Sequence, residues 1–361
     1  MQKRQFNTDC EGPISLNDNA YELANHFIEN GGRFFARISK YDDILADIVK
    51  RPGYKAGDTL KLILPFLKAY GASNEIIEEY CGRNIIMVPG AKSSLEYISD
   101  KMPTFIISTS YEPYLNALCS FIGFDRKHVY CTKLDIDKYP ISSHEIERLK
   151  EIREEIDLLP ELEVASNVEI FDELPYRTRE TVKRLDRFFW EEILSMKSGE
   201  MLKDINPVGG VEKANAVLES LKVTGNDIQD VVYVGDSITD VQALNLVKRG
   251  GGLAVSFNGN RYAIKEADIA CISGHTIIVS IVADLFSKKG KGAVMRLAGN
   301  WSLDSITKHG IDRILVDQLL SAHRKSLPTV EIVDESNRGR LTNESEAFRK
   351  SLRGEDVGSL G

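Results

Sequence analysis

The chain has 361 residues, 42% of them hydrophobic, which is enough to form about two domains or one domain with a large insertion. Its formal net charge of −8 opposes binding to nucleic acid and to anionic membranes. No apolar run approaches the roughly 20 residues that span a bilayer, residues 1–9 are too short and polar for a signal peptide, and the five cysteines are scattered, so we expect a cytoplasmic protein.

The first motif is the stretch Phe6–Pro13, in which two carboxylates, Asp9 and Glu11, precede a Gly-Pro pair. Proline fixes its own φ and biases the preceding residue away from the helix, so a short extended run ends and turns here. A carboxylate at a strand end can face a ligand, although an aspartate beside Gly-Pro also suits a turn without any catalytic role. The motif therefore indicates a catalytic or binding site only if further candidate residues follow later in the chain.

Helical periodicity dominates residues 16–85. Gly31-Gly32 and Pro52-Gly53 interrupt it, and strand periodicity is absent. An all-helical segment inserted directly after a strand end is typical of a lid over an active site. We therefore predict a helical cap over 16–85.

An α/β pattern resumes over residues 86–139. The apolar run from Thr104 to Ser110 predicts a buried parallel strand, and a helix follows near Pro113. Ser108 lies at the C-terminal edge of this strand. Ligands bind at that edge in open α/β sheets, so Ser108 is a candidate binding hydroxyl.

Residues 140–205 are rich in Glu, Lys and Arg at helical spacing, which predicts a second helical insertion with solvated faces. After it, Lys213 lies in the first turn of another predicted helix. A cation is disfavoured at the positive end of a helix dipole. Lys213 therefore either pairs with a nearby anion or is exposed to solvent.

The most strand-like segment, residues 230–234, runs into Gly-Asp-Ser-Ile-Thr-Asp. This places Asp236 and Asp240 at a helix entrance, where their four-residue spacing directs both carboxylates to one side. Either can cap the helix, but two caps are hard to arrange, so at least one has another role. Strands at 253–257 and 269–272 and a helix at 276–286 complete the predicted core.

Periodicity weakens over residues 287–361. We predict one amphipathic helix over Ile306–Leu320 and then a polar, unstructured tail that is poor in aromatic residues. A contact with a second copy or a protein partner is expected through this C-terminal region.

The candidate residues of four separate segments all fall at strand ends or helix starts. Clustered carboxylates raise one another's pKa unless a cation lies among them, and oxygen ligands favour a hard divalent metal. A hydroxyl and a lysine add groups that hold anionic oxygens, so the constellation suits phosphoryl transfer. Its members are Asp9, Glu11, Ser108, Lys213, Asp236 and Asp240.

In this order the motifs resemble the haloacid dehalogenase superfamily, from the N-terminus to about residue 285. Pro89-Gly90-Ala91, Gly252–Asn258 and Lys265–Ile269 are similar to its phosphoserine phosphatase branch. The resemblance implies an α/β, Rossmann-like core with a central parallel sheet, built from 1–15, 86–139 and 206–286, together with the cap at 16–85 and the second insertion at 140–205. The opening around Asp9 is also similar to an archaeal group of hydrogenase-associated subunits.

The resemblance implies a Mg²⁺-dependent phosphatase that acts on a small phosphorylated metabolite. Asp9 then takes the place of the nucleophile that forms an aspartyl-phosphate. Glu11 occupies the position of the general acid/base aspartate, and its backbone carbonyl would bind Mg²⁺.

For the other candidates, the resemblance implies that Ser108 and Lys213 hold phosphate oxygens. Asp236 would be a metal ligand, and Asp240 an outer partner of the metal or of the lysine. Asp9 and Glu11 complete this predicted metal site.

Two features depart from the family pattern. Glu11 is one methylene longer than the usual aspartate, which changes where it can deliver a proton, and the first strand is unusually polar. A second reading is therefore a weak or inactive regulatory or scaffold subunit that binds a phosphorylated ligand or a partner protein. Dehalogenase or phosphonatase chemistry ranks third.

Overall fold

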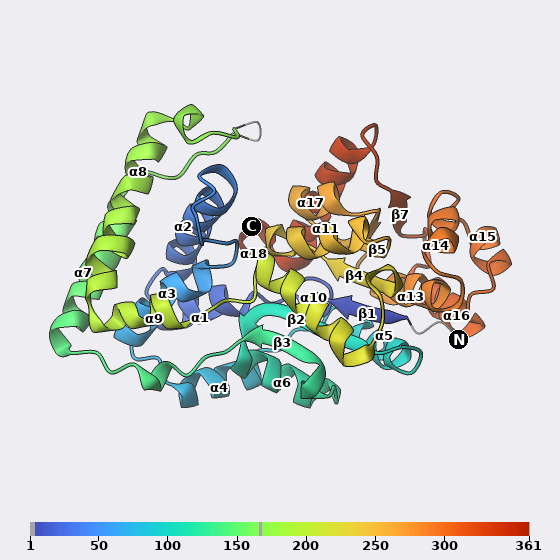
Figure 1. Ribbon diagram of the computed structural model, residues 1–361, viewed down its shortest axis with the longest axis horizontal. Coiled ribbons are helices and arrows are strands. Elements are labelled where there is room, and N and C mark those ends of the chain that lie inside the picture. Colours follow the sequence, from blue (N-terminus) through green and yellow to red (C-terminus); the bar gives the residue numbers. More distant parts are fainter. Residues whose placement is uncertain (1–3, 166–167, 361) are drawn as a thin grey trace.

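The computed structural model describes residues 4–165 and 168–360. Its centre is a seven-stranded sheet with the order β3-β2-β1-β4-β5-β6-β7 (Figure 1). Neighbouring strands from β3 to β6 pair in parallel, and β7 pairs antiparallel with β6. The α/β class and the central parallel sheet are therefore confirmed. The strands are β1 (Gln5–Thr8), β2 (Thr104–Tyr111), β3 (Val129–Thr132), β4 (Val231–Gly235), β5 (Leu253–Phe257), β6 (Ile269–Ile272) and β7 (Thr329–Ile332).

The helices fall into three groups along the chain. Those between β1 and β2 are α1 (Asn19–Phe27), α2 (Gly31–Asp43), α3 (Thr59–Ala69), α4 (Asn74–Arg83) and α5 (Ala91–Ser99). Those between β2 and β4 are α6 (Glu112–Ile122), α7 (Ser143–Leu158), α8 (Tyr176–Asp186), α9 (Glu200–Asp204) and α10 (Val211–Thr224). The remainder are α11 (Val241–Arg249), α12 (Arg261–Glu266), α13 (Ile277–Lys289), α14 (Lys291–Ala298), α15 (Leu303–Lys308), α16 (Arg313–Ala322), α17 (Arg338–Arg353) and α18 (Glu355–Gly358).

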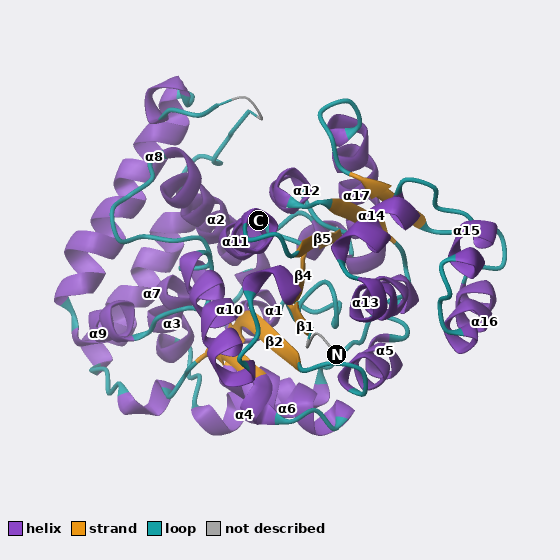
Figure 2. Ribbon diagram, turned by 45° about the vertical axis from the view of Figure 1, so that its right-hand side comes forward, coloured by secondary structure: helices purple, strands orange, loops and turns teal. Residues whose placement is uncertain are grey.

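Helices cover both faces of the sheet (Figure 2). Successive strand residues point to opposite faces, so Ile106 packs in the cluster that contains Ile281 of α13, while Ile107 packs in the cluster that contains Val217 of α10 and Leu244 of α11. Burial on both faces explains why β2, β4, β5 and β6 are continuous apolar runs that the sequence predicted within one residue at either end.

The polar first strand is nevertheless central in the sheet. Its inward side chains, Gln5 and Asn7, are fully buried and form a hydrogen-bonded group with α10. Ser220 Oγ accepts from Gln5 Nε2 at 2.6 Å and from Asn7 Nδ2 at 3.0 Å, and Thr224 Oγ1 donates to Gln5 Oε1 at 2.7 Å. A buried polar strand is tolerated here because its amides have partners.

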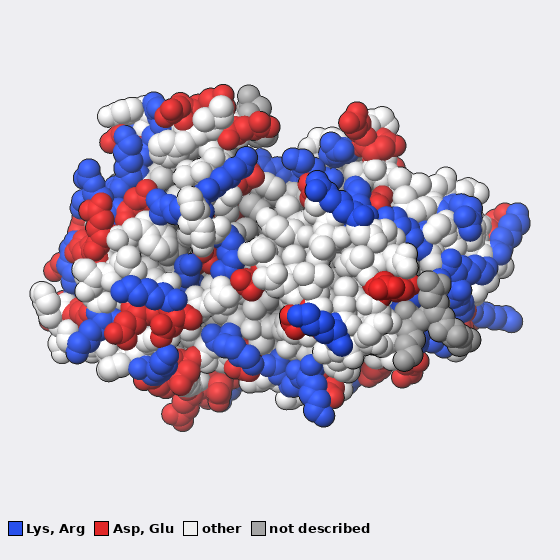
Figure 3. Space-filling view, in the orientation of Figure 1, with Lys and Arg blue, Asp and Glu red and all other residues white. Residues whose placement is uncertain are grey.

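The two segments predicted to be helical insertions pack against each other. Residues 16–85 hold α1 to α4 without a strand, as predicted, and α3 packs against both α7 and α9. They form the left-hand part of Figure 1, where acidic and basic side chains are interspersed (Figure 3). Arg148 of α7, for example, pairs with Glu155 and Glu192, in accord with the solvated faces predicted for 140–205. The division of the chain into separate domains stays a prediction.

The expectation of an unstructured tail is wrong. Residues 329–332 extend the sheet as β7, and residues 338–353 form α17, which packs on α12 and β6. The helix buries Leu341, Ser345 and Arg349, and two of these three side chains are polar, so composition concealed the buried face. The single helix expected at 306–320 is split into α15 and α16 around Gly310, whose φ is +76°. Within the described residues, no helix is both long enough and apolar enough to cross a bilayer.

Candidate active site

Two neighbouring strands bring the first and last motifs together. β1 and β4 pair with Thr8 opposite Val234, and the Asp9 amide donates to the Val234 carbonyl at 2.8 Å. Asp9 and Asp236 therefore leave the carboxyl ends of adjacent strands at the same edge of the sheet. Gly12 allows the close approach, since its φ is +99° and a Cβ there would lie 2.0 Å from Asp236 Oδ2.

Lys213 is held between two carboxylates and is fully buried. Its Nζ lies 2.5 Å from Asp9 Oδ2 and 2.7 Å from Asp240 Oδ1. Burial lowers the pKa of Lys213, but Asp240 and Asp9 outweigh that effect and raise it above its usual value. Of the two alternatives predicted for Lys213, pairing with an anion and exposure to solvent, the structure shows the first.

Asp240 orients its neighbours and has no free oxygen. Its Oδ1 accepts from Lys213 and from the Tyr233 hydroxyl at 2.8 Å, and its Oδ2 accepts from the backbone amides of Asp236 at 2.9 Å and Ser237 at 3.1 Å. These bonds close the turn after β4 and fix the lysine. Asp240 thus contacts the lysine directly, and its role as an outer partner of the lysine or of a metal stays a prediction.

The carboxylate cluster has the donor chemistry of a site for a hard divalent cation. Asp9, Asp236 and Asp240 each offer an oxygen within 4.8 Å of the others, and all three are buried. Burial raises the pKa of Asp9 to about 8; Lys213 opposes the rise, while Asp240 and Asp236 add to it. A bound cation would relieve this repulsion, so the residues fit Mg²⁺. Each oxygen of Asp240 already accepts two hydrogen bonds, whereas Oδ1 and Oδ2 of Asp9 have one polar partner each, so Asp9 and Asp236 are the side chains that would hold it.

Glu11 lies in the cavity wall beside these carboxylates and is partly exposed. Its Oε1 accepts from the backbone amide of Asn19 at 2.8 Å, in the first turn of α1. Burial of the carboxyl and the nearby Asp18 raise its pKa well above the usual value. A carboxyl with a raised pKa holds its proton to higher pH than an ordinary glutamate does, which suits a general acid.

Ser108 lies behind the cavity rather than in its wall. It is fully buried, and its Oγ donates to Ser110 Oγ at 3.1 Å and accepts from the Ser110 amide at 3.2 Å. Thr109 and Ser110 are the members of this run that line the cavity. The predicted segment therefore does reach the site. Its residues in the cavity wall, however, are Thr109 and Ser110 and not Ser108.

The sequence analysis missed two arginines of α17. Arg349 Nη1 contacts Asp236 Oδ2, and Arg353 Nη1 lies 3.5 Å from the same oxygen. Arg353 also donates to the backbone carbonyls of Leu16, at 3.0 Å from Nε, and Asn17. The available signal was the four-residue spacing of Leu341, Ser345, Arg349 and Arg353, which places them on one helix face.

Comparison with known proteins agrees with this arrangement. The family model of haloacid dehalogenase-like hydrolases matches residues 57–276, which is more than half of the chain. The chain belongs to this family. The predicted superfamily is therefore confirmed, and the protein is a hydrolase of that family.

Among solved structures, one archaeal protein is similar to this hydrolase over the whole length of both chains. The structure of gene product AF1437 from Archaeoglobus fulgidus is 30% identical and has a TM-score of 0.80, covering 100% of this chain and 99% of that one. Phosphoserine phosphatase in its apo form is 14% identical with a TM-score of 0.41, covering 77% and 98% of the two chains. Substrate-bound phosphoserine phosphatase is 16% identical with a TM-score of 0.43, covering 75% and 93%. Similarity as low as that of the last two does not bear on function.

A search of curated proteins found no match. The similarity of the first motif to hydrogenase-associated subunits is not tested by these comparisons and stays a prediction.

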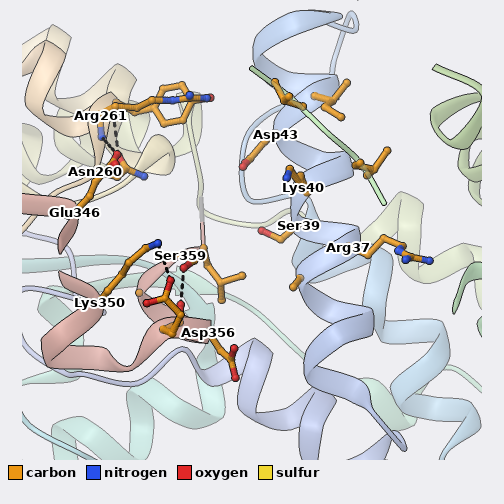
Figure 4. Close-up of a pocket in the computed structure, with 18 of the residues that line it drawn as sticks. Arg37, Ser39, Lys40, Asp43, Asn260, Arg261, Glu346, Lys350, Asp356 and Ser359 are labelled. Atoms are coloured by element: carbon orange, nitrogen blue, oxygen red, sulfur yellow. Dashed lines mark hydrogen bonds and ion pairs between the residues drawn. The ribbon is translucent and has the colours of Figure 1, made fainter. Parts of the chain in front are cut away.

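Two adjoining cavities lead to the carboxylate cluster. The inner one, of about 90 Å³, is lined by Asp9, Glu11 and Asp236. The outer one, of about 830 Å³, lies between α2 and the helices α12, α17 and α18 (Figure 4). Ser39 and Asp43 of α2 line both, so the outer cavity continues into the inner one. The predicted lid thus forms one wall of the approach to Asp9.

Proposed function

We propose that this protein is a Mg²⁺-dependent phosphatase that hydrolyses a small phosphomonoester through an aspartyl-phosphate on Asp9. The observation that carries the proposal is the buried pair of Asp9 and Lys213, with Nζ at 2.5 Å from Oδ2, beside a second carboxylate, Asp236, in the wall of a cavity. A nucleophilic carboxylate between a lysine and a metal-binding aspartate is what phosphoryl transfer needs.

In the first step, a carboxylate oxygen of Asp9 attacks phosphorus, and the bond from phosphorus to the leaving oxygen breaks. Glu11 gives its proton to that leaving oxygen. Lys213 stabilises the carboxylate form of Asp9 and the negative charge on the phosphoryl oxygens. When bound by Asp9, Asp236 and the Glu11 carbonyl, Mg²⁺ supplies further neutralisation of that charge.

In the second step, Glu11 acts as a base and takes a proton from water, whose oxygen attacks phosphorus. The bond to Asp9 breaks, orthophosphate leaves, and the carboxylate of Asp9 is restored. Ser110, in the cavity wall, offers its hydroxyl to the phosphoryl oxygens in front of Ser108, whereas the Thr109 hydroxyl already donates to the Val208 carbonyl at 3.1 Å.

The test is a panel of phosphorylated metabolites and p-nitrophenyl phosphate, assayed with Mg²⁺ and with a chelator. We expect turnover that the chelator abolishes and that Asp9→Asn abolishes without loss of fold. Asp304→Asn is the matched control, because Asp304 is exposed and pairs only with Lys308 among the described residues. Undiminished turnover by Asp9→Asn would contradict the proposal. Binding of a phosphorylated ligand without any turnover would favour the scaffold or regulatory reading.

A cytoplasmic location is part of the same proposal. All five cysteines are buried and none forms a disulfide, which suits a reducing compartment.

A further inference from the structure

The carboxylate cluster has positive groups at two separate ends. Lys213 contacts Asp9 and Asp240, whereas Arg349 and Arg353 contact Asp236. No carboxylate among these three is shared between the lysine and the arginines. A ligand whose single phosphoryl group lies at Asp9 would contact Lys213 and would leave Arg349 and Arg353 without a contact.

The two guanidinium groups of the arginine end share one ion-pair partner, Asp236, while Asp18 and Glu11 act on Arg353 from the same cavity wall without forming an ion pair. Two guanidinium groups meet one oxygen, Asp236 Oδ2, and the other contacts of Arg353 are to uncharged backbone carbonyls. If Asp236 also holds a cation, its single negative charge is shared among that cation and the guanidinium groups of Arg349 and Arg353. An anion that accepts hydrogen bonds from both guanidinium groups would therefore add direct partners that the nearby Asp18 and Glu11 do not supply.

Arg349 also has an unused donor. The side chains of Arg349 and Arg353 are each only 4% exposed, and both line the inner cavity with Asp9. Within the described part of the chain, the buried Arg349 Nε–H has no hydrogen-bond acceptor. Leaving a buried donor unpaired is costly, so its presence in a cavity wall points to an acceptor supplied by a ligand.

The two arginines are held in position because helix α17, which carries them, packs against the rest of the protein. Ser345, one turn before Arg349, donates to the Gly259 carbonyl at 2.6 Å, and Leu341 is fully buried one turn earlier. The loop after Gly259 is itself bonded to the site, because the Asn260 amide donates to the Asp236 carbonyl at 2.9 Å. Helix α17 lies outside the residues 57–276 that match the family model, so this feature belongs to the C-terminal region of this chain.

We propose that Arg349 and Arg353 form a subsite for a second anionic group of the substrate, so that the site prefers phosphomonoesters that also carry a carboxylate or another phosphate. This inference rests on the proposed phosphatase function for the place of the first phosphoryl group. The planar guanidinium fork binds either kind of anion, and two pairs of probes distinguish them.

The experiment measures binding by calorimetry in the Asp9→Asn background with Mg²⁺, where turnover does not interfere. The first pair is 3-phosphoglycerate and glycerol 3-phosphate, which differ by a carboxylate. The second is fructose 1,6-bisphosphate and fructose 6-phosphate, which differ by a phosphate. We expect at least tenfold tighter binding of the doubly anionic member in one pair, and the pair that shows it identifies the group.

That preference should disappear when Arg349→Ala or Arg353→Ala is added. Arg349→Lys keeps the charge but loses the fork and Nε, so it should retain part of the preference and guards against misfolding of the alanine variants. Arg340→Ala is the matched control, because Arg340 lies on the same helix but pairs with Glu331 and Glu344 at the surface. Equal affinity within both pairs, or a preference that survives loss of both arginines, would overturn the proposal.

The proposed function fails separately. If the wild-type protein hydrolyses none of these compounds or p-nitrophenyl phosphate, the phosphatase assignment is wrong. The binding preference and its loss in the arginine variants remain measurable in that case.

Discussion

Arg349 contacts the carboxylate of Asp236, which lies 113 residues earlier in the chain at the end of β4. The same carboxylate is one of the two that would hold a divalent cation. A guanidinium and a metal ion repel each other, so their positions on Asp236 are coupled. The C-terminal helix is thereby connected to metal binding, although it lies far from the first motif in sequence.

From this coupling we expect Arg349→Ala to bind a divalent cation more tightly than the wild-type protein, on the order of tenfold, because removal of a nearby like charge favours the cation. The measurement is a titration with Mn²⁺, followed by the loss of the free-ion electron paramagnetic resonance signal, in the absence of any phosphate ester. Arg340→Ala should bind Mn²⁺ as the wild type does. Weaker binding by Arg349→Ala would instead mean that the arginine holds Asp236 in the orientation that the metal requires.

Gly12→Ala tests the close approach between the first motif and Asp236. A Cβ at Gly12 would lie 2.0 Å from Asp236 Oδ2 and 2.4 Å from its Cγ, so the carboxylate must move. A positive φ also costs alanine about 1–3 kcal/mol of stability. Gly53→Ala is a matched control, because Gly53 has a φ of +74° with nothing within 4 Å of the new methyl group.

Both glycine variants should lose stability, but only Gly12→Ala should lose Mn²⁺ binding and phosphatase activity. Thermal unfolding and the metal titration separate the two effects. Normal metal binding by Gly12→Ala would show that Asp236 is not held where the structure places it.

The sequence was sufficient to find most of the carboxylate site. Asp9, Asp236 and Lys213 could be brought together from one sequence because each follows a strand or starts a helix, and the carboxyl ends of parallel strands share one edge. The strands themselves were visible where both faces are buried, since such strands are continuous apolar runs, as at 253–257.

The rest depended on tertiary contacts that composition does not reveal. The short strand at 129–132 was not predicted, and β1 looked insecure because the partners of Gln5 and Asn7 come from a helix more than 200 residues away. The buried face of α17 includes Ser345 and Arg349, which are ordinarily exposed residue types, and their burial is stabilised by the Gly259 carbonyl and Asp236. A hydropathy pattern therefore assigns this helix to solvent.

Lys213→Ala should slow turnover severely. The side chain is fully buried against Asp9 and Asp240, so its removal takes away a preorganised positive charge at the reacting group. We expect a loss on the order of 3 kcal/mol of transition-state stabilisation, or roughly 10²-fold in kcat. The control is Lys222→Ala on the same helix, where the side chain is exposed and pairs with Glu219. A Lys213→Ala enzyme close to the wild-type rate would exclude the lysine from the mechanism.

Asp42 gives a pH-dependent prediction about stability. It lines the inner cavity, is 3% exposed, and accepts from the Gly57 amide at 2.9 Å through Oδ2, while Oδ1 has no partner among the described residues. Burial raises the pKa of Asp42 from its ordinary value of 3.8 to about 6. Between these two values the folded state binds more protons than the unfolded state, so this group makes the protein less stable as pH rises through that range.

Asp42→Asn removes this penalty while its amide oxygen can still accept from Gly57. The variant should therefore be more stable than the wild type by up to about 3 kcal/mol at pH 7.5, and by about half as much at pH 5. Urea unfolding at the two pH values measures both differences, and Asp304→Asn at the surface should show neither. A difference that does not change with pH would mean that the stabilisation comes from packing and not from the charge.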